Sequence, residues 1–283
     1  MLMDNDSITN FSDFTFSDGS KLAYRSCRHG CEPGALPEEE PLHVVFCGGF
    51  HSNMRGIKAQ KLEEICSKNN LSYTRFDYRG HGESEGDPAT FSLTDWLNDT
   101  LLILDNIHEP IVLVGSSMGG WLATVAATRR PEKIRGLLLL ASAPDFLQEL
   151  VLPRLSKSDS WDLQQGLIVS LPSAYEQSYP LTQKLMDSGQ ELSVFKPIPL
   201  TDDTLTESNP GPRQLTCPIR MIHGTADSDV PFELSIRLMN EFKQAEARLT
   251  LLSEADHRLS DERSLACIEH ELLMLAIEVG NRG

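Results

Sequence analysis

Residues 111–121 read IVLVGSSMGGW, and this stretch decides the fold. Its first four residues are apolar without polar alternation, which is typical of a strand that is covered on both faces in a parallel sheet. Two glycines, Gly115 and Gly119, flank Ser117, and residues 117–129 continue with helical spacing. The stretch therefore predicts a buried strand, a sharp turn at Ser117 and a helix.

The same alternation of strands and helices extends on both sides of this unit. The buried strands that we expect are 43–47, 72–77, 111–115, 136–141, 219–222 and 248–252. The helices are expected at 57–68, 92–106, 117–129, 232–245 and 261–279. Two short strands, 11–16 and 21–25, precede them and are joined by an Asp18-Gly19 turn. Because strand–helix–strand order implies right-handed crossovers, we predict an α/β fold with a mostly parallel sheet sandwiched by helices.

The alternation stops between residues 145 and 212. Segments 145–155 (DFLQELVLPRL) and 174–189 (AYEQSYPLTQKLMDSG) have helical spacing, and we expect no buried strand between them. The Pro- and Gly-containing TESNPGP stretch at 206–212 is typical of a linker. We therefore predict a core formed by residues 1–144 and 213–283, with a small helical cap inserted at 145–212.

The charge of the chain limits its partners. It carries 41 acidic and 25 basic residues, a formal net charge of −16. A field of this sign repels phosphate backbones and anionic lipid headgroups, and no apolar stretch approaches the length of a membrane span. We expect neither nucleic-acid binding nor stable membrane anchoring, and we attribute the acidity to solubility.

The N-terminal stretch MLMDNDSITN is acidic and has no basic region followed by an apolar run. It therefore resembles neither a secretory signal nor a transit peptide, and we expect a cytoplasmic protein. The six cysteines suggest no disulfide framework. Cys27 and Cys31 flank His29, but no second ligand pair follows at zinc-finger spacing, so we expect no metal site.

The motif around Ser117 is G-x-S-x-G. In a strand-to-helix turn it forces the central serine into a strained conformation, so that the hydroxyl projects above the sheet. The start of the following helix adds a partial positive charge that suits a developing oxyanion. Ser116 is the alternative, but only Ser117 is centred between the glycines, and we interpret Ser117 as a nucleophile.

A serine hydroxyl needs a base, and the base needs an orienting acid. Where a G-x-S-x-G serine comes first in the chain, the acid follows a late strand and the histidine comes after the acid. Asp227 lies just beyond strand 219–222, while Asp229, the alternative, lies against a helix start where it can serve as a cap. Of the two later histidines, His270 falls inside the last expected helix and His257 in a loop. We predict Asp227 as the acid and His257 as the base.

An acyl-transfer site also needs two backbone N–H groups for the oxyanion. We expect one from Met118, which follows the nucleophile, and one from Phe50 in the loop after strand 43–47. His51 in the same loop can face the pocket, although a surface position is commoner. Four apolar side chains of the expected cap either line an acyl pocket or pack the cap onto the core, namely Leu147, Leu150, Trp161 and Leu167.

These motifs resemble those of the α/β-hydrolase fold superfamily. Residues 77–84 (DYRGHGES) are similar to the turn after its fourth strand, and residues 223–231 are similar to its acid loop. A narrower resemblance is to the mitochondrial acyl-protein thioesterases, also described as acyl-glucuronide esterases, and their bacterial relatives. It is carried by residues 49–50, 55–59, 75–78, 116–121, 143–146 and 256–260.

This resemblance implies removal of S-acyl groups from protein cysteines, or hydrolysis of small acyl esters, by Ser117, Asp227 and His257. The predicted reaction is two-step acyl transfer that requires no metal or organic cofactor. The alternatives are a small peptidase, a C–C bond hydrolase, or a binding protein that keeps the fold without turnover. Dehalogenases and epoxide hydrolases of similar shape need an acidic nucleophile where Ser117 stands.

Overall fold

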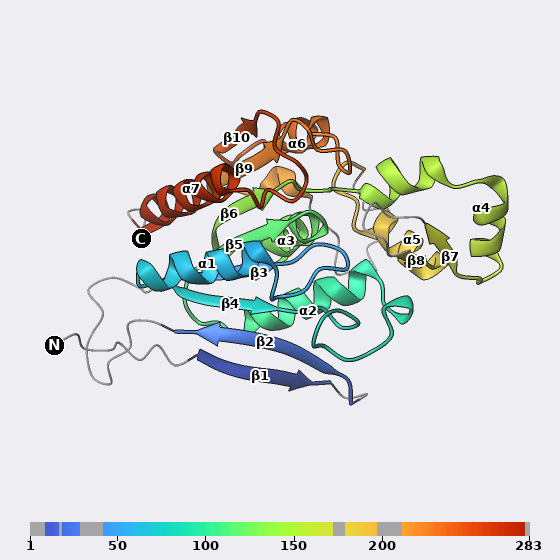
Figure 1. Ribbon diagram of the computed structural model, residues 1–283, viewed down its shortest axis with the longest axis horizontal. Helices are drawn as coiled ribbons and strands as arrows, with labels where there is room; N and C mark the ends of the chain where they lie inside the picture. Colours follow the sequence, from blue (N-terminus) through green and yellow to red (C-terminus); the bar gives the residue numbers. More distant parts are fainter. Residues whose placement is uncertain (1–8, 17–18, 29–41, 172–178, 197–210, 281–283) are drawn as a thin grey trace.

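A central eight-stranded sheet organises the molecule (Figure 1). The computed structural model describes residues 9–16, 19–28, 42–171, 179–196 and 211–280. The strand order is β1-β2-β4-β3-β5-β6-β9-β10. The bounds are β1 (Thr9–Thr15), β2 (Lys21–Cys27), β3 (His43–Cys47), β4 (Ser72–Phe76), β5 (Ile111–Ser116), β6 (Ile134–Leu140), β9 (Ile219–Gly224) and β10 (Ala247–Leu252).

The sheet is parallel except at one edge. From β4 to β10 every neighbouring pair runs parallel, whereas β1 pairs with β2 and β2 with β4 in antiparallel fashion. Every residue of β3, β4, β5 and β9 is buried, polar side chains such as Thr74 and Arg220 included, as strands of a sheet covered on both faces require. The predicted fold class is confirmed.

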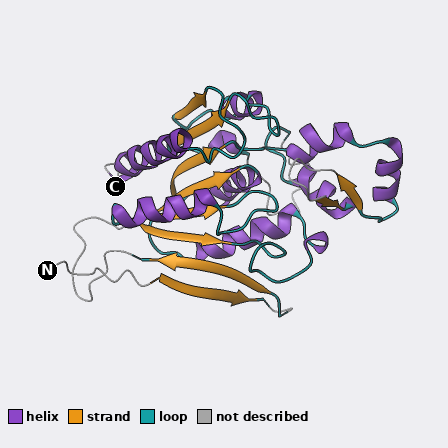
Figure 2. Cartoon of the chain, viewed as in Figure 1, coloured by secondary structure: helices purple, strands orange, loops and turns teal. Residues whose placement is uncertain are grey.

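Helices cover both faces of the sheet (Figures 1 and 2). Their bounds are α1 (Ile57–Lys68), α2 (Leu93–Asp105), α3 (Met118–Arg129), α6 (Glu233–Met239) and α7 (Glu262–Gly280). α1 and α7 pack together on one face, and α2 and α3 pack together on the other. α6 ends six residues before the predicted 245, because Phe242 turns into the core and the chain must start β10 at Ala247 beside Ile219. No helix within the described ranges is both long and apolar enough to cross a membrane.

The chain between β6 and β9 forms a separate group of elements beside the carboxyl ends of the parallel strands (Figure 1). It contains a π-helical turn (Leu147–Val151), a 3₁₀ turn (Leu152–Arg154), α4 (Lys157–Gln164), β7 (Val169–Leu171), β8 (Tyr179–Leu181) and α5 (Gln183–Glu191). β7 and β8 pair antiparallel. We call this part, residues 145–196, the inserted segment.

Two expectations about the inserted segment are wrong. A helix was expected over 174–189, but α5 begins only at Gln183, and Pro180 lies in strand β8 opposite Ser170. Proline lacks the N–H that a helix interior needs, so the helix starts after it. The expectation of no buried strand also fails, because Val169 of β7 and Leu181 of β8 are buried. Residues 174–178 lie outside the described residues.

Asp145 ties the two ends of the inserted segment together. Its φ is +53°, and its buried carboxylate accepts hydrogen bonds from the backbone N–H groups of Val194 (2.8 Å) and Phe195 (3.2 Å). The hydroxyl of Ser193 also donates to it. A charged acceptor with three donors makes a strong junction, and it holds residues 193–195 against the start of the inserted segment.

Candidate active site

The turn at Ser117 has the strained backbone that the motif predicts. Its φ is +56° and its ψ −121°, a region that non-glycine residues rarely occupy. Hydrogen bonds hold it there: its N–H donates to Leu140 O (2.9 Å), and its carbonyl accepts from Gly120 N (2.9 Å) and Ala143 N (3.0 Å). The turn is thus anchored to β6 and to the loop after it.

The glycines around Ser117 allow strand and helix to touch. A Cβ on Gly119 would lie 2.2 Å from the carbonyl oxygen of Cys47, and a Cβ on Gly115 would lie 2.4 Å from the carbonyl oxygen of Gly119. Both obstacles are backbone atoms, which cannot rotate away. Only glycine fits at either position.

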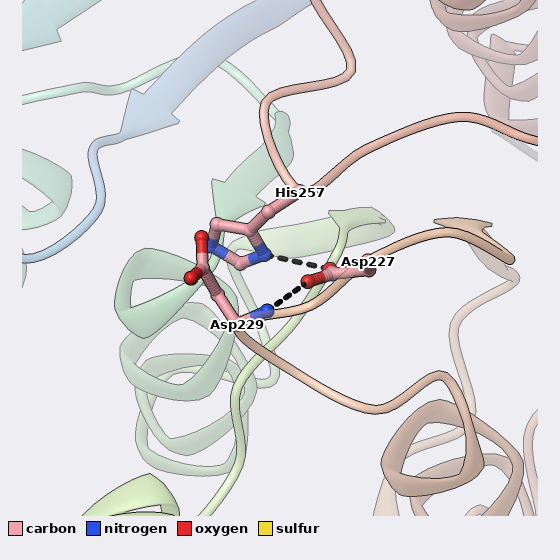
Figure 3. Close-up of side chains that lie close together, drawn as sticks. All are labelled: Asp227, Asp229 and His257. Carbon is pink, nitrogen blue, oxygen red and sulfur yellow. Dashed lines mark hydrogen bonds and ion pairs between the residues drawn. The ribbon is translucent and has the colours of Figure 1, made fainter. Parts of the chain in front are cut away.

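Ser117, His257 and Asp227 form one chain of hydrogen bonds. Ser117 Oγ lies 3.0 Å from His257 Nε2, and His257 Nδ1 lies 2.7 Å from Asp227 Oδ2, as Figure 3 shows for the second pair. Because an ionised carboxylate only accepts, Nδ1 donates to it and Nε2 is left to accept the Ser117 hydroxyl proton. This is the arrangement that a serine nucleophile and its base require.

Asp227 is held as an anion by its neighbours. Its side chain is buried, and Oδ1 accepts from the N–H groups of Asp229 (2.9 Å) and Val230 (2.8 Å). Burial alone raises the pKa of Asp227, but hydrogen bonds from His223 and His257 outweigh it and hold the pKa well below the ordinary value. Nε2 of His223 lies 3.0 Å from Oδ2, a contact that the sequence analysis missed. The His223-Gly224 pair before the acid loop was the available signal.

The alternative residues occupy other positions. Asp229 lines the cavity beside His257, but the oxygen 2.7 Å from His257 Nδ1 belongs to Asp227 (Figure 3). His270 is exposed on α7, and Ser116 is the last residue of β5. The ligand atoms of Asp227, Asp229 and His257 lie within 4.8 Å of one another, yet the hydrogen bonds described above account for this proximity.

The structure describes one of the three residues considered for a zinc site, where no metal was expected. Cys27 is buried at the end of β2. His29 and Cys31 lie in the segment that the structure does not describe.

Phe50 and Met118 both line the cavity into which Ser117 opens. Met118 begins α3, and the first N–H groups of a helix have no carbonyl partner within it. The loop that carries Phe50 approaches Ser117 closely, since a Cβ on Gly49 would lie 3.3 Å from Ser117 Cβ. His51 has a φ of +53° and is half-buried. It lines the same cavity and does not take the surface position that is commoner for a loop histidine.

The side chains of Asp77 and Arg75 hold the loop that carries Phe50 and His51, a function that the sequence analysis missed. Asp77 Oδ1 accepts from Met54 N (2.5 Å) and Oδ2 accepts from Glu83 N (2.8 Å), while the Arg75 guanidinium donates to Met54 O. Burial raises the pKa of Asp77, although these donors oppose the rise. The Asp at the start of the 77–84 turn therefore couples that turn to the candidate oxyanion loop.

The cavity has a volume of about 570 Å³ and two kinds of wall. One is apolar and includes Phe50, Phe146, Leu150, Val151 and Leu181. The other contains polar side chains from the loop before α1, from α1 and from the loop after β10, namely Ser52, Asn53, Lys58, Arg258 and Ser260. Such a cavity can hold an apolar acyl chain next to Ser117.

Of the four apolar residues expected to line the pocket or pack the cap, only Leu150 lines the cavity. Leu147 is fully buried in the core. Trp161 and Leu167 are 58% and 53% exposed and do neither. They lie on and just after α4, at the outer end of the inserted segment (Figure 1).

The fold agrees with comparisons to known proteins. Residues 44–269 match the alpha/beta hydrolase family, and the chain belongs to it. Membership and relatives named thioesterases define it as a hydrolytic enzyme of the esterase and thioesterase class. The resemblance seen in the sequence is confirmed.

Five of the similar curated proteins share one name. "Palmitoyl-protein thioesterase ABHD10, mitochondrial" of Rattus norvegicus is 33% identical over 266 residues, covering 89% of this chain and 78% of the relative. The Homo sapiens protein of that name is 29% identical over 268 residues, covering 93% and 79%. The solved structure of alpha/beta hydrolase domain-containing protein 10 from mouse matches with a TM-score of 0.77 at 28% identity, covering 95% of this chain and 99% of that one. A putative hydrolase from Agrobacterium vitis S4 matches with a TM-score of 0.80 at 26% identity, covering 95% and 98%.

The expectation of a cytoplasmic protein is wrong by this comparison. The relatives that are named palmitoyl-protein thioesterase ABHD10 are mitochondrial by that name. A targeting segment is separate from the catalytic fold and is removed after import. Composition and the N-terminal residues were therefore poor evidence for a compartment.

Proposed function

We propose that this hydrolase cleaves carboxylic ester and thioester bonds of acyl substrates through an acyl-enzyme on Ser117. The observation that carries the proposal is the hydrogen-bond chain Ser117–His257–Asp227, with N···O distances of 3.0 and 2.7 Å. It opens on a cavity with an apolar wall. Relatives named palmitoyl-protein thioesterases support thioesters, including S-acylated proteins, as substrates.

In the proposed first step His257 takes the Ser117 proton as Oγ attacks the acyl carbonyl. Asp227 keeps the imidazole in the tautomer that accepts this proton and stabilises the imidazolium that forms. His257 then protonates the leaving sulfur or oxygen. In the second step a water molecule, deprotonated by His257, attacks the acyl-enzyme and releases the carboxylic acid. No step requires a metal or an organic cofactor.

The tetrahedral intermediate needs donors aimed at its oxyanion. We propose that the N–H groups of Phe50 and Met118 supply them, since both residues line the cavity beside Ser117. Loss of one such donor costs about 3 kcal/mol in comparable sites. The bonds from Asp77 and Arg75 to Met54 therefore matter for rate, because they hold the loop that carries Phe50.

We also propose that residues 145–212 act as a cap that selects the acyl group. Phe146, Leu150, Val151 and Leu181 contribute to the apolar wall from this part of the chain. Apolar walls that enclose a ligand determine which chain lengths fit.

A fluorophosphonate probe tests the nucleophile. We expect the wild type and Ser116→Ala to be labelled, and Ser117→Ala not to be labelled. Labelling that disappears in Ser116→Ala and persists in Ser117→Ala would reassign the nucleophile. An unlabelled wild type would favour the binding-protein alternative.

A series of acyl chains, each prepared as matched oxygen ester and thioester, tests the substrate class. We expect hydrolysis of both, absent in Ser117→Ala. Matched amides and C–C substrates test the remaining alternatives. Turnover of amides or C–C substrates with no ester or thioester hydrolysis would replace this proposal by one of them.

A further inference from the structure

His257 determines which side of the cavity receives the leaving group. A general acid must come within about 3 Å of the atom that it protonates. The leaving sulfur or oxygen of an acyl substrate therefore lies against the loop that carries His257, and the acyl chain points away from it. The apolar residues Phe146, Leu150 and Val151 line the cavity from a different part of the chain, the inserted segment. This assignment rests on the proposed function.

The leaving-group side carries positive charge. Arg258 directly follows His257 and lines the cavity, and Lys58 lines it from the first turn of α1. The Lys58 ammonium donates to the carbonyl oxygen of Arg258, so the α1 wall and the His257 loop meet at this point. Arg154 adds a third cation from the inserted segment, and Asp229 is the one carboxylate among the lining residues that the structure describes.

This charge is opposite to that of the protein as a whole. The chain has 41 acidic against 25 basic residues, whereas the described lining of the cavity holds three cations, Lys58, Arg154 and Arg258, and one carboxylate, Asp229. A cleft lined by one sign of charge concentrates and orients ligands of the opposite sign. The local excess of cations therefore points to an anionic group on the substrate.

A lysine at position 58 is energetically unfavourable if its function is only to make a structural contact. Burial lowers its pKa to about 8, with Asp256 and Asp227 opposing the shift and Arg258 adding to it. Both carboxylates already accept hydrogen bonds, Asp227 from His257 and Asp256 from the N–H groups of Arg258 and Leu259. In the described part of the chain no carboxylate forms an ion pair with Lys58. A neutral amide donor would satisfy the Arg258 carbonyl without this loss of hydration.

We infer that Lys58, together with Arg258, binds a carboxylate on the leaving group, and that the preferred substrates are S-acyl derivatives of small acidic thiols. The ammonium contacts the residue next to His257, so the carboxylate lies only a few bonds from the sulfur that His257 protonates. The Ser117 Oγ–carbon bond forms and the carbon–sulfur bond breaks as the thiol takes the proton from His257. Water then cleaves the acyl-enzyme, so that thioester and water give carboxylic acid and thiol.

Two thioesters that differ only in the charge of the leaving group test this inference. S-octanoyl-3-mercaptopropionate carries a carboxylate, and S-octanoyl-3-mercaptopropionamide is its neutral counterpart of nearly equal size. We expect kcat/KM to be about tenfold higher for the carboxylate in the wild type, the effect of one charge-assisted contact. The preference should weaken as salt is raised, because ions screen the attraction.

Variants separate recognition from a structural role. Lys58→Met should bring the ratio of the two kcat/KM values close to one, while Lys58→Arg keeps most of it. Lys243→Met removes an exposed lysine that does not line the cavity, and its ratio should equal that of the wild type. A purely structural Lys58 would change both rates equally and leave the ratio intact.

The outcomes are distinct. A wild-type ratio near or below one, or an unchanged ratio in Lys58→Met, overturns the inference while leaving the proposed function in place. If neither thioester is hydrolysed by the labelled, folded wild type, the thioesterase function itself fails and the inference fails with it. If Lys58→Met does not fold, the wild-type ratio, its salt dependence and Lys58→Arg still decide the question.

Discussion

His223 Nε2 lies 3.0 Å from Oδ2 of Asp227, the same carboxylate oxygen that contacts His257. It also lies 3.0 Å from Val230 O. Both partners only accept, so Nε2 of His223 carries the hydrogen. Ser235 Oγ is 2.7 Å from the other ring nitrogen and fixes the ring. A fully buried histidine thus orients the carboxylate that orients His257.

Replacing His223 with leucine removes this donor from a buried carboxylate. We expect a loss of about 1–3 kcal/mol of unfolding free energy near neutral pH, and a lower kcat as Asp227 loses its orientation. Urea unfolding and steady-state kinetics measure the two effects. Ser235→Ala, which removes only the partner of Nδ1, should cost less in both.

Acid unfolding of the same variant gives a second check. The pKa of Asp227 is depressed in the fold, so its stabilisation is present above the unfolded value, about 3.9, and is lost as pH falls through the folded value. His223→Leu reduces this depression. The stability difference between wild type and variant should therefore narrow as the pH drops below about 4. A difference that stays constant down to the acid transition would mean that His223 does not act through Asp227.

Asp77→Asn should lower activity although residue 77 does not line the cavity. Asp77 accepts from the N–H groups of Met54 and Glu83, but an asparagine amide offers one oxygen and places its NH₂ against the second donor. The loop that carries Phe50 then loses part of its anchor. We expect kcat to fall at least about tenfold, approaching the loss of one oxyanion donor. The matched control is Glu83→Ala, which keeps the backbone N–H that Asp77 accepts from.

The outcome for Asp77 is read from kcat and KM separately. A change in KM with an unchanged kcat would place the effect on substrate binding rather than on the oxyanion loop.

Gly119→Ala tests whether the tight turn at Ser117 is obligatory. The added Cβ would lie 2.2 Å from Cys47 O and 2.3 Å from Gly48 O. Both are backbone atoms of the neighbouring strand and loop, so we expect a loss of about 3 kcal/mol or more, or no folded protein. Thermal unfolding measures it. Gly280→Ala, whose Cβ would meet nothing within 4 Å at the end of α7, should be neutral or slightly stabilising. A Gly119→Ala protein with the wild-type melting temperature would refute the packing argument.

The sequence predicts those parts of the fold that depend on local pattern. Strand β3 and helix α1 have the predicted bounds. A short apolar run buries its side chains as a strand, and apolar residues at helical spacing bury theirs along one face of a helix. The carboxyl ends of parallel strands meet at one edge. Ser117 and His257, 140 positions apart, are for that reason expected together, and they lie 3.0 Å apart.

Such local patterns do not predict which groups a polar side chain contacts in the folded protein. The spacing of Asp77 does not say which backbone groups it will meet, since Met54 comes from another loop. His223 precedes the acid loop, but only the folded loop brings Val230 O within reach of its ring. The predictions for the inserted segment fail for a related reason. Its helical spacing marks Leu147 and Trp161 alike as apolar, but only the packed structure decides that the first is buried and the second exposed.

The preference for a charged leaving group should depend on pH in a direction set by Lys58. Its pKa is lowered to about 8 by burial, against the opposing effect of Asp256 and Asp227. The ammonium is therefore charged below about pH 8 and neutral above it, and its attraction for a carboxylate disappears as the pH rises. We expect the ratio of kcat/KM for the mercaptopropionate and mercaptopropionamide thioesters to decline toward one between about pH 7 and about pH 9.

Taking a ratio of two substrates under one condition cancels the pH effects on the catalytic residues that both substrates share, and enzyme-free blanks remove the background attack by hydroxide. kcat/KM is the right measure because it reports the ionisation of the free enzyme. Lys58→Arg is the control, since a guanidinium stays charged throughout this range, and its ratio should stay level while that of the wild type falls. A wild-type ratio that does not change with pH, or an equal decline in Lys58→Arg, would assign the preference to another group, with Arg258 and Arg154 the remaining cations of the cavity.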